Sequence, residues 1–218
     1  MTTTKPIIVY GAGGLARETR WLIERINQHR PQYSFAGYVV TDTARLGAHD
    51  SVDEVVGDEA WLLAQDDVFV AIGIGSPAAR TAIGRRLSTQ LDDNRFPVLV
   101  DPTAVYDART CTFEPGAIVT AANVLTVHVR VRRFAFLNLD CTVGHEADIG
   151  EGVVMNPSVN ISGGVVIGHS TLVGTGAQIL QYAQIGAEAT VGAGAVVNKD
   201  VPAGTTVVGV PAKPLRRG

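Results

Sequence analysis

Large apolar residues recur at every sixth position along the second half of the chain, from Phe113 to Val197. The residue two places before each of them is small or β-branched, apart from Asn123. Glycine often follows directly, as at Gly144 and Gly168, where we expect turn dihedral angles that only glycine adopts cheaply. We call the apolar residues the anchors: Phe113, Val119, Leu125, Val131, Leu137, Val143, Ile149, Met155, Ile161, Ile167, Val173, Ile179, Ile185, Val191 and Val197.

A period of six matches neither the 3.6-residue turn of an α-helix nor the two-residue alternation of a single strand. It is typical of a parallel β-helix in which each hexad forms one short, flat face. Three such faces make one coil of 18 residues, so the fifteen hexads predict five coils with the anchors pointing into a stacked core.

The first part of the chain follows a different pattern, in which short apolar strands alternate with helical segments. Residues 6–10 read as a buried strand, followed by a glycine-rich turn and an amphipathic helix. This alternation predicts a small parallel α/β sheet. The expected apolar contacts of the first helix are Leu15, Trp21, Leu22 and Ile26; further strands are expected at 35–40 and 68–75, and helices at 58–65 and 77–91.

The segment 93–105 contains two prolines and ends the helical pattern. We therefore place a domain boundary near residue 100, with an α/β Rossmann-like domain at 1–100 and an all-β parallel β-helix at 101–218. A chain of 218 residues, 46% of them hydrophobic, is long enough to bury a core in each part.

Charge and composition narrow the classes of partner. The net charge of −3 gives no basic field, which argues against nucleic acid or an anionic membrane surface and favours a small molecule. The start of the chain lacks the pattern of a signal peptide, and no apolar run is long enough to span a bilayer, so we expect a cytoplasmic protein. Cys111 and Cys141 lie 30 residues apart, at different corners of the predicted coil, and are expected to be buried, unpaired thiols.

His145 is the candidate for chemistry within the repeat. It lies two residues after the anchor Val143, where side chains project outwards at a corner, and one coil of 18 residues further on is Gly163. Because successive layers stack about 4.8 Å apart, a backbone N–H of Gly163 is expected near the imidazole. Acyl transfer requires such a pair: a base near neutral pKa, and a backbone donor for the developing oxyanion. Glu146 is the candidate to orient the imidazole or raise its basicity.

The whole chain is similar to the sialic acid O-acetyltransferase and bacillosamine N-acetyltransferase group of hexapeptide-repeat sugar acyltransferases. The matching stretches are IIVYGAGGLARE, VGHEADIGEGVVMNPSVNISGGVVIG and VVGVPAKPLR. The resemblance implies left-handed coils, a homotrimer, His145 as general base, Glu146 as its assistant and Gly163 as the oxyanion donor. The chain departs from the pattern at Val154, where many members have a second histidine, and at Leu15 with Ala16, where His-Gly is common.

Gly11, Gly13 and Gly14 follow a strand and open a helix, which is the context of a phosphate-binding loop. NAD is disfavoured, because Asp42 lies 29 residues beyond Gly13 rather than about 20 and no second Rossmann half follows. The resemblance implies instead that the loop holds a nucleotide-linked sugar or a sugar acid. Asp42 and Ser76 are further candidate contacts of this acceptor.

The resemblance places the GVPAK segment beside the pantetheine channel of coenzyme A. Gly163 and Lys213 are the candidate contacts of coenzyme A, and Arg216, Arg217 and the run 130–133 are further candidates to pair with its phosphates. For each basic residue, a solvated surface position is the competing interpretation.

The leading hypothesis is an acetyl-CoA-dependent acetyltransferase that acts on an amino or hydroxyl group of a sugar, with a nucleotide-linked amino sugar as the favoured acceptor. A sialic acid type of O-acetyltransferase and a nucleotide-sugar-binding trimeric scaffold without turnover are the alternatives. A zinc hydratase of the γ-carbonic anhydrase type needs three converging histidines, which the spacing of His128, His145 and His169 does not give, so no metal site is predicted. We expect His29, His49, His128 and His169 to be structural.

Overall fold

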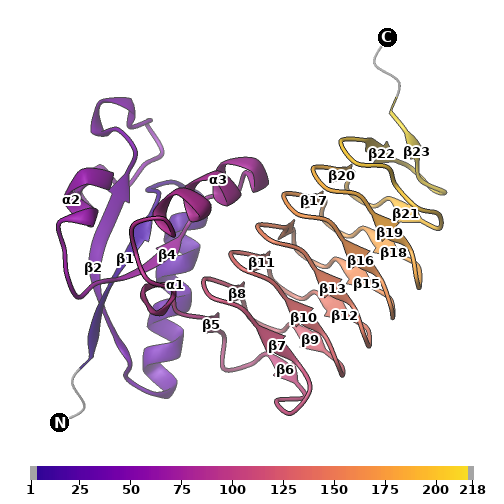
Figure 1. Cartoon of the computed structure of the whole chain (residues 1–218), viewed down its shortest axis with the longest axis horizontal. Helices are drawn as coiled ribbons and strands as arrows, with labels where there is room; N and C mark the ends of the chain where they lie inside the picture. The colour runs from indigo at the N-terminus through magenta and orange to yellow at the C-terminus, as the bar shows by residue number, and fades with distance from the viewer. Residues whose placement is uncertain (1–3, 216–218) are drawn as a thin grey trace.

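The computed structural model describes residues 4–215, and Figure 1 shows an α/β part at one end of a stack of triangular coils. The α/β part has one parallel sheet in the strand order β3-β2-β1-β4. Its elements are β1 (Lys5–Tyr10), α1 (Gly14–His29), β2 (Tyr33–Val40), β3 (Val55–Asp58), α2 (Glu59–Leu63), β4 (Phe69–Ile72) and α3 (Pro77–Leu87), with 3-10 turns at Thr43–Arg45, Val52–Glu54 and Asp93–Arg95.

The expected strands and helices of the α/β part are present, and the structure adds β3 at the sheet edge, which the sequence pattern did not indicate. One predicted core contact is wrong: Trp21 is 46% exposed. Its ring lies beside the guanidinium of Arg25, 5.2 Å from the ring centre. The buried stripe of α1 runs instead through Ala16, Thr19, Leu22, Ile23 and Ile26.

The second part is a parallel β-helix whose coils have three faces, built from strands of two residues apart from the three-residue β22. The first face contains β5 (Leu99–Val100), β8 (Ile118–Val119), β11 (Phe136–Leu137), β14 (Val154–Met155), β17 (Leu172–Val173), β20 (Thr190–Val191), β22 (Thr206–Val208) and β23 (Lys213–Pro214). The second contains β6 (Val105–Tyr106), β9 (Val124–Leu125), β12 (Thr142–Val143), β15 (Asn160–Ile161), β18 (Gln178–Ile179) and β21 (Val196–Val197). The third contains β7 (Thr112–Phe113), β10 (Arg130–Val131), β13 (Asp148–Ile149), β16 (Val166–Ile167) and β19 (Gln184–Ile185).

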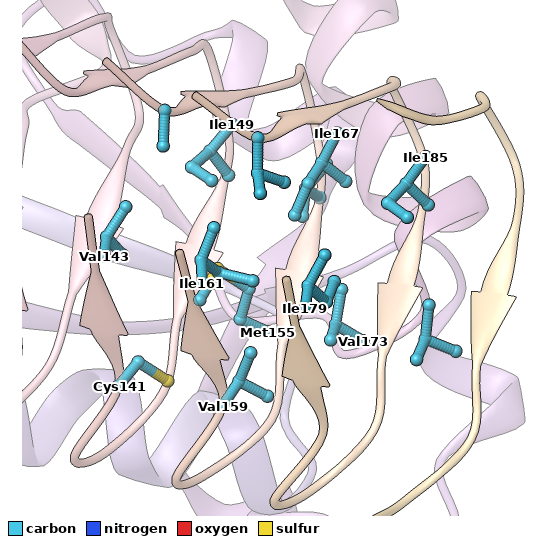
Figure 2. Packing of buried hydrophobic residues seen from close by; sticks show 14 of the residues in the cluster. Cys141, Val143, Ile149, Met155, Val159, Ile161, Ile167, Val173, Ile179 and Ile185 are labelled. Atoms are coloured by element: carbon cyan, nitrogen blue, oxygen red, sulfur yellow. The ribbon is translucent and has the colours of Figure 1, made fainter. Parts of the chain in front are cut away.

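The anchors are the inward-facing residues of these strands, as the period of six predicts. On the second face Val143 pairs with Ile161, and Ile161 with Ile179, a register of 18 residues per coil. Figure 2 shows these three side chains in a row along successive coils, with Ile149 and Ile167 in a second row. Every anchor is buried except Phe113, which is half-buried and packs against the same core.

The glycines that directly follow an anchor serve a different purpose from the one predicted. They do not adopt a left-handed backbone; the residue two places later does, as at Glu146 with φ 62°. A Cβ on Gly144 would lie 2.6 Å from the backbone nitrogen of Gly163, and one on Gly168 would lie 2.4 Å from that of Ala187. These glycines are required because the next coil approaches too closely to leave room for a side chain.

The two cysteines are free thiols in the structure. Cys141 is buried as expected, and burial raises the pKa of its thiol to about 12. Cys111 is only half-buried, because it belongs to the first full coil, where no earlier layer covers that side as completely. No helix within residues 4–215 has the length and apolar character needed to cross a membrane.

The α/β part packs on the first face of the β-helix, with α1 between the sheet and the coils (Figure 1). The outward side chains Ile118, Phe136 and Val154 of that face share a core with α1. Beside it, the fully buried Arg80 donates hydrogen bonds to the carbonyls of Phe134 in the β-helix and Ile72 at the end of β4. The strand β5 already belongs to the first face, just before the predicted boundary at residue 100.

The stacked anchors predict a large stability effect for a single truncation. Ile149→Ala removes a fully buried side chain from the middle of the stack and is expected to lower the free energy of unfolding by about 2–5 kcal/mol. Thr112→Ala, at an exposed outward position of β7 on the same face, is the control and should change it by less than about 1 kcal/mol. Chemical denaturation measures both; equal effects would contradict the assignment of the anchors as the core.

Candidate active site

His145 lies at the corner between the second and third faces. The strand β12 ends at Val143, Gly144 follows in close contact with the next coil, and the chain then turns so that the side chain of His145 projects outwards, 53% exposed. The backbone around it is fixed by the ladder, since the amide of Gly144 donates to the carbonyl of Ile161 at 2.7 Å and that of Gly164 donates to the carbonyl of His145 at 2.7 Å.

The imidazole lies directly against Gly163 in the next coil, as the 18-residue register predicts. A Cβ built on Gly163 would be 2.3 Å from Nε2 of His145 and 2.5 Å from its Cε1. No side chain fits at position 163 while the imidazole keeps this place. The contact between His145 and Gly163 therefore follows from the 18-residue register between coils and from the absence of a side chain at position 163.

The amide of Gly163 donates no hydrogen bond to any of the residues 4–215. The amide of Arg133, which holds the same place in its hexad but lies at the corner between the third and first faces, donates to the carboxylate of Glu114 at 3.1 Å. An amide at this place in a hexad can therefore reach an acceptor outside the backbone ladder. The missing Cβ of Gly144 leaves space beside the Gly163 nitrogen. An N–H that has no acceptor among residues 4–215 and lies next to an imidazole can bind an oxygen on which negative charge develops.

Glu146 contacts the opposite nitrogen of the ring. Its Oε2 lies 3.4 Å from Nδ1 of His145, and its side chain is 63% exposed. A carboxylate on this side favours the tautomer that carries the proton on Nδ1, which leaves the lone pair of Nε2 free to accept a proton beside Gly163. The arrangement brings an imidazole, a carboxylate and a backbone N–H together at one corner.

Tyr182 is a further residue of this corner that the sequence reasoning missed. Its ring would be 2.4 Å from a Cβ on Gly164, and it is 66% exposed. The ring therefore lies on the side of the Gly163–Gly164 segment that faces away from His145. The sequence does place Tyr182 at this corner, because it is two coils of 18 residues beyond Glu146.

A cavity of about 430 Å³ opens at the carboxyl ends of β1, β2 and β4. Gly11, Gly13, Gly14 and Asp42 all line it, so the structure brings these four predicted residues together. Gly11 has φ 111° and its Cβ would lie 2.9 Å from the side chain of Ile74, so no other residue fits this turn. The start of the 16-residue helix α1 borders the same space, a position that suits phosphate.

Carboxylates lie along the rim of this cavity. Asp42 accepts a hydrogen bond from the amide of Ala44 at 2.9 Å. Asp50 also lines the cavity and accepts one from the amide of Gly47 at 2.6 Å. Asp50 could not be singled out from the residue pattern, because it belongs to a loop without a regular pattern.

The remaining predicted contacts lie elsewhere. Ser76 is not part of the cavity lining; its hydroxyl accepts from the amide of Ala79 at 3.4 Å and begins α3. Lys213 lines a separate open cavity of about 660 Å³ with Val208, Pro214 and Leu215. Arg216 and Arg217 lie outside the described residues.

Two arginines of the basic run 130–133, Arg132 and Arg133, form ion pairs within the chain. Arg132 forms a two-pronged ion pair with Asp148, with both N–O distances 2.7 Å. Arg133 pairs with Asp93 at 2.6 Å. These pairings favour the structural interpretation of the run over contact with coenzyme A phosphates. Within residues 4–215 no three histidine, cysteine, aspartate or glutamate side chains lie close enough together to hold a metal ion.

No protein-family model matches the chain. A curated relative, the GDP-perosamine N-acetyltransferase of Escherichia coli, is 29% identical over 221 residues, covering 96% of this chain and 96% of the relative. Two similar solved structures are the acetyltransferase domain of PglB from Neisseria gonorrhoeae in complex with acetyl coenzyme A, and PerB from Caulobacter crescentus in complex with CoA and GDP-perosamine. The first has a TM-score of 0.84 at 26% identity, covering 98% of this chain and 100% of that one. The second has a TM-score of 0.84 at 25% identity and covers 99% of each chain.

The homologues and structural neighbours are thus sugar N-acetyltransferases with hexapeptide repeats, as the resemblance in the sequence implied. The likeness extends over both parts of the chain and confirms the predicted fold class, an α/β Rossmann-like part followed by a left-handed β-helix.

The close contact between His145 and Gly163 can be tested by adding a methyl group at position 163. Gly163→Ala is expected to displace the imidazole, because its Cβ would overlap Nε2, and to shift the ring signals of His145 in an NMR spectrum of histidine-labelled protein. Gly176→Ala is the matched control: its Cβ meets nothing within 4 Å, and Ala122 already adopts the same left-handed turn. Unchanged His145 signals in Gly163→Ala would contradict this geometry.

Proposed function

We propose that this chain is a hexapeptide-repeat sugar acyltransferase that transfers the acetyl group of acetyl-CoA to an amino group of a nucleotide-linked sugar. The observation that carries the proposal is the pairing of Nε2 of His145 with the free amide of Gly163. The curated relative that matches along nearly its whole length acts as a GDP-perosamine N-acetyltransferase, which supports an amino sugar as the acceptor.

The reaction proceeds by direct attack. The amine of the acceptor attacks the thioester carbonyl carbon while Nε2 of His145 takes the proton that the amine loses. The carbonyl oxygen becomes an oxyanion and accepts a hydrogen bond from the Gly163 amide. The C–S bond then breaks, and the leaving thiolate takes the proton from the imidazolium. An acyl-enzyme on Cys141 is disfavoured, because that thiol is buried and its pKa is raised to about 12.

The cavity of the α/β part is the proposed acceptor site. Its glycine loop and the start of α1 provide amides for the phosphates of a nucleotide, and Asp42 and Asp50 are placed to accept hydrogen bonds from hydroxyl groups. Lys213, at the end of the chain that the structure describes, is the proposed contact of coenzyme A. Ser76 drops out of the proposed acceptor site because it lies outside the lining.

The two half-sites of one chain lie on opposite sides of the β-helix. The α/β part covers the first face, and His145 occupies the corner opposite that face. The acceptor cavity of one chain therefore serves a histidine on a neighbouring copy in the proposed homotrimer. Exposed apolar side chains on the other two faces, among them Val124 at 40% and Val166 at 37%, support burial against such neighbours.

The base is tested by removing the imidazole. His145→Ala is expected to lower kcat for acetylation of a nucleotide-linked amino sugar by about 10²–10⁴-fold, the usual scale for a positioned base. His29→Ala is the control, since His29 lies at the exposed end of α1 and should leave turnover unchanged. Release of free thiol from acetyl-CoA measures both. Wild-type turnover in His145→Ala would remove His145 from the mechanism.

The shared site is tested by complementation. Gly75→Phe fills the acceptor cavity, since the new Cβ meets only Leu15 at 3.6 Å and the ring extends into the lined space. Neither Gly75→Phe nor His145→Ala is expected to turn over alone. Mixed trimers should recover about a quarter of wild-type activity, because each productive site needs one intact part from each of two chains. Mixtures as inactive as the parents would place both half-sites in one chain.

A further inference from the structure

Four side chains form a connected network at the wall of the acceptor cavity. The hydroxyl of Tyr10 donates to Oε2 of Glu59 at 2.6 Å and lies 3.0 Å from Oγ1 of Thr41. Arg86 donates from Nε to Oε1 of Glu59 at 2.7 Å and from Nη2 to the Tyr10 hydroxyl at 3.4 Å. Tyr10 and Thr41 both line the cavity, at the ends of β1 and β2.

The charge states of this network are fixed by its own members. The Arg86 guanidinium, with the hydrogen bond from Tyr10, holds the pKa of the Glu59 carboxyl below its usual range, so Glu59 is an anion near neutral pH and can only accept. Burial and the contact with Glu59 raise the pKa of the Tyr10 phenol, so Tyr10 keeps its proton.

Counting hydrogens gives the direction of every bond. The single hydrogen of Tyr10 is used on Glu59, so the Tyr10 oxygen acts as an acceptor towards its other neighbours. The contact at 3.0 Å between Tyr10 and Thr41 must then use the single hydrogen of Thr41. Oγ1 of Thr41 is left with lone pairs only, and these are what it presents to a ligand in the cavity.

We propose that Thr41 is a specificity-determining residue of the acceptor cavity, accepting a hydrogen bond from a hydroxyl or N–H group of the nucleoside, and that Tyr10, Glu59 and Arg86 act as positioning residues by consuming its hydrogen. This inference rests on the proposed function, which places the phosphates at the glycine loop of β1. Thr41 directly follows the adjacent strand β2, and β1 and β2 pair at Tyr10 and Val39, so the nucleoside next to the phosphates lies within its reach.

A cavity with this polarity rejects ligands that carry only an acceptor at the same place. Two oxygen or fluorine acceptors facing each other leave both without a partner, whereas a hydroxyl or N–H group satisfies Thr41. The wild-type protein should therefore distinguish a donor from an acceptor-only group of nearly the same size. This discrimination should depend on Tyr10, because Tyr10 accepts the hydrogen of Thr41. Tyr10 need not contact the ligand group that is varied.

Calorimetric binding to the full chain tests the inference with GDP and UDP as probes. Each is compared with its 2′-fluoro and 3′-fluoro analogues, which replace a ribose donor by an acceptor, and with its N-methylated base, which removes an N–H. For wild type, one of these changes is expected to weaken binding by about tenfold, and which one does so identifies ribose or base as the source of the donor. No weakening by any of them would overturn the inference.

The variants separate the role of Thr41 from general damage. Thr41→Val should weaken binding of the better probe by about 3–10-fold and lose the discrimination, whereas Thr41→Ser should keep both within about twofold. Tyr10→Phe should reduce the tenfold discrimination to about twofold, because the Thr41 hydroxyl can then turn its hydrogen to the ligand. Melting temperatures check that each variant is folded.

The outcomes distinguish this inference from the function on which it depends. If wild type binds neither GDP nor UDP, the nucleotide-linked acceptor is wrong and the role of Thr41 is wrong with it. Suppose instead that wild type binds a probe, and that the loss of binding free energy caused by the altered ligand group adds to the loss caused by Thr41→Val. The ligand group and Thr41 then do not interact, and only the role of Thr41 is overturned.

Discussion

The hydrogen-bond register of 18 residues between successive coils is the constraint on which the rest of the structure depends. Because Thr142 and Val143 pair with Asn160 and Ile161, every group at one corner has a counterpart one layer away at a fixed place. The anchors keep that register, since a shift by one residue would move each of them from the core to the surface. The proposed catalytic pair, His145 and Gly163, comes from two successive coils and is positioned by this packed core.

The same register explains why the chemistry depends on glycines more than on polar residues. Gly144 lets the next coil approach, and Gly163 leaves the space that the imidazole of His145 occupies. The α/β part adds a second constraint by covering the first face, fixed there by Arg80 and by the core around Phe136. The corner of His145 and the cavity proposed for the acceptor consequently lie on different sides of one chain, which is why we propose that activity requires assembly.

The repeat could be predicted from the sequence because it is strictly local: six-residue spacing fixes the anchors, the faces and the neighbour of His145. The α/β part was predictable in outline, but the edge strand β3 and the exposure of Trp21 depend on tertiary packing that periodicity does not contain. The glycines that follow some of the anchors were correctly singled out but for the wrong reason, since the spacing of residues along the chain does not show how closely successive coils approach. Tyr10, Thr41 and Glu59 are far apart in sequence and form a network only after folding.

The most direct measurement of the central claim is a crystal structure of the protein with acetyl-CoA bound. We expect the acetyl carbonyl oxygen to lie about 2.7–3.1 Å from the Gly163 amide, with Nε2 of His145 facing the path by which an amine reaches the carbonyl carbon. A thioester held against a different group, with the imidazole out of reach of its carbonyl carbon, would contradict the account.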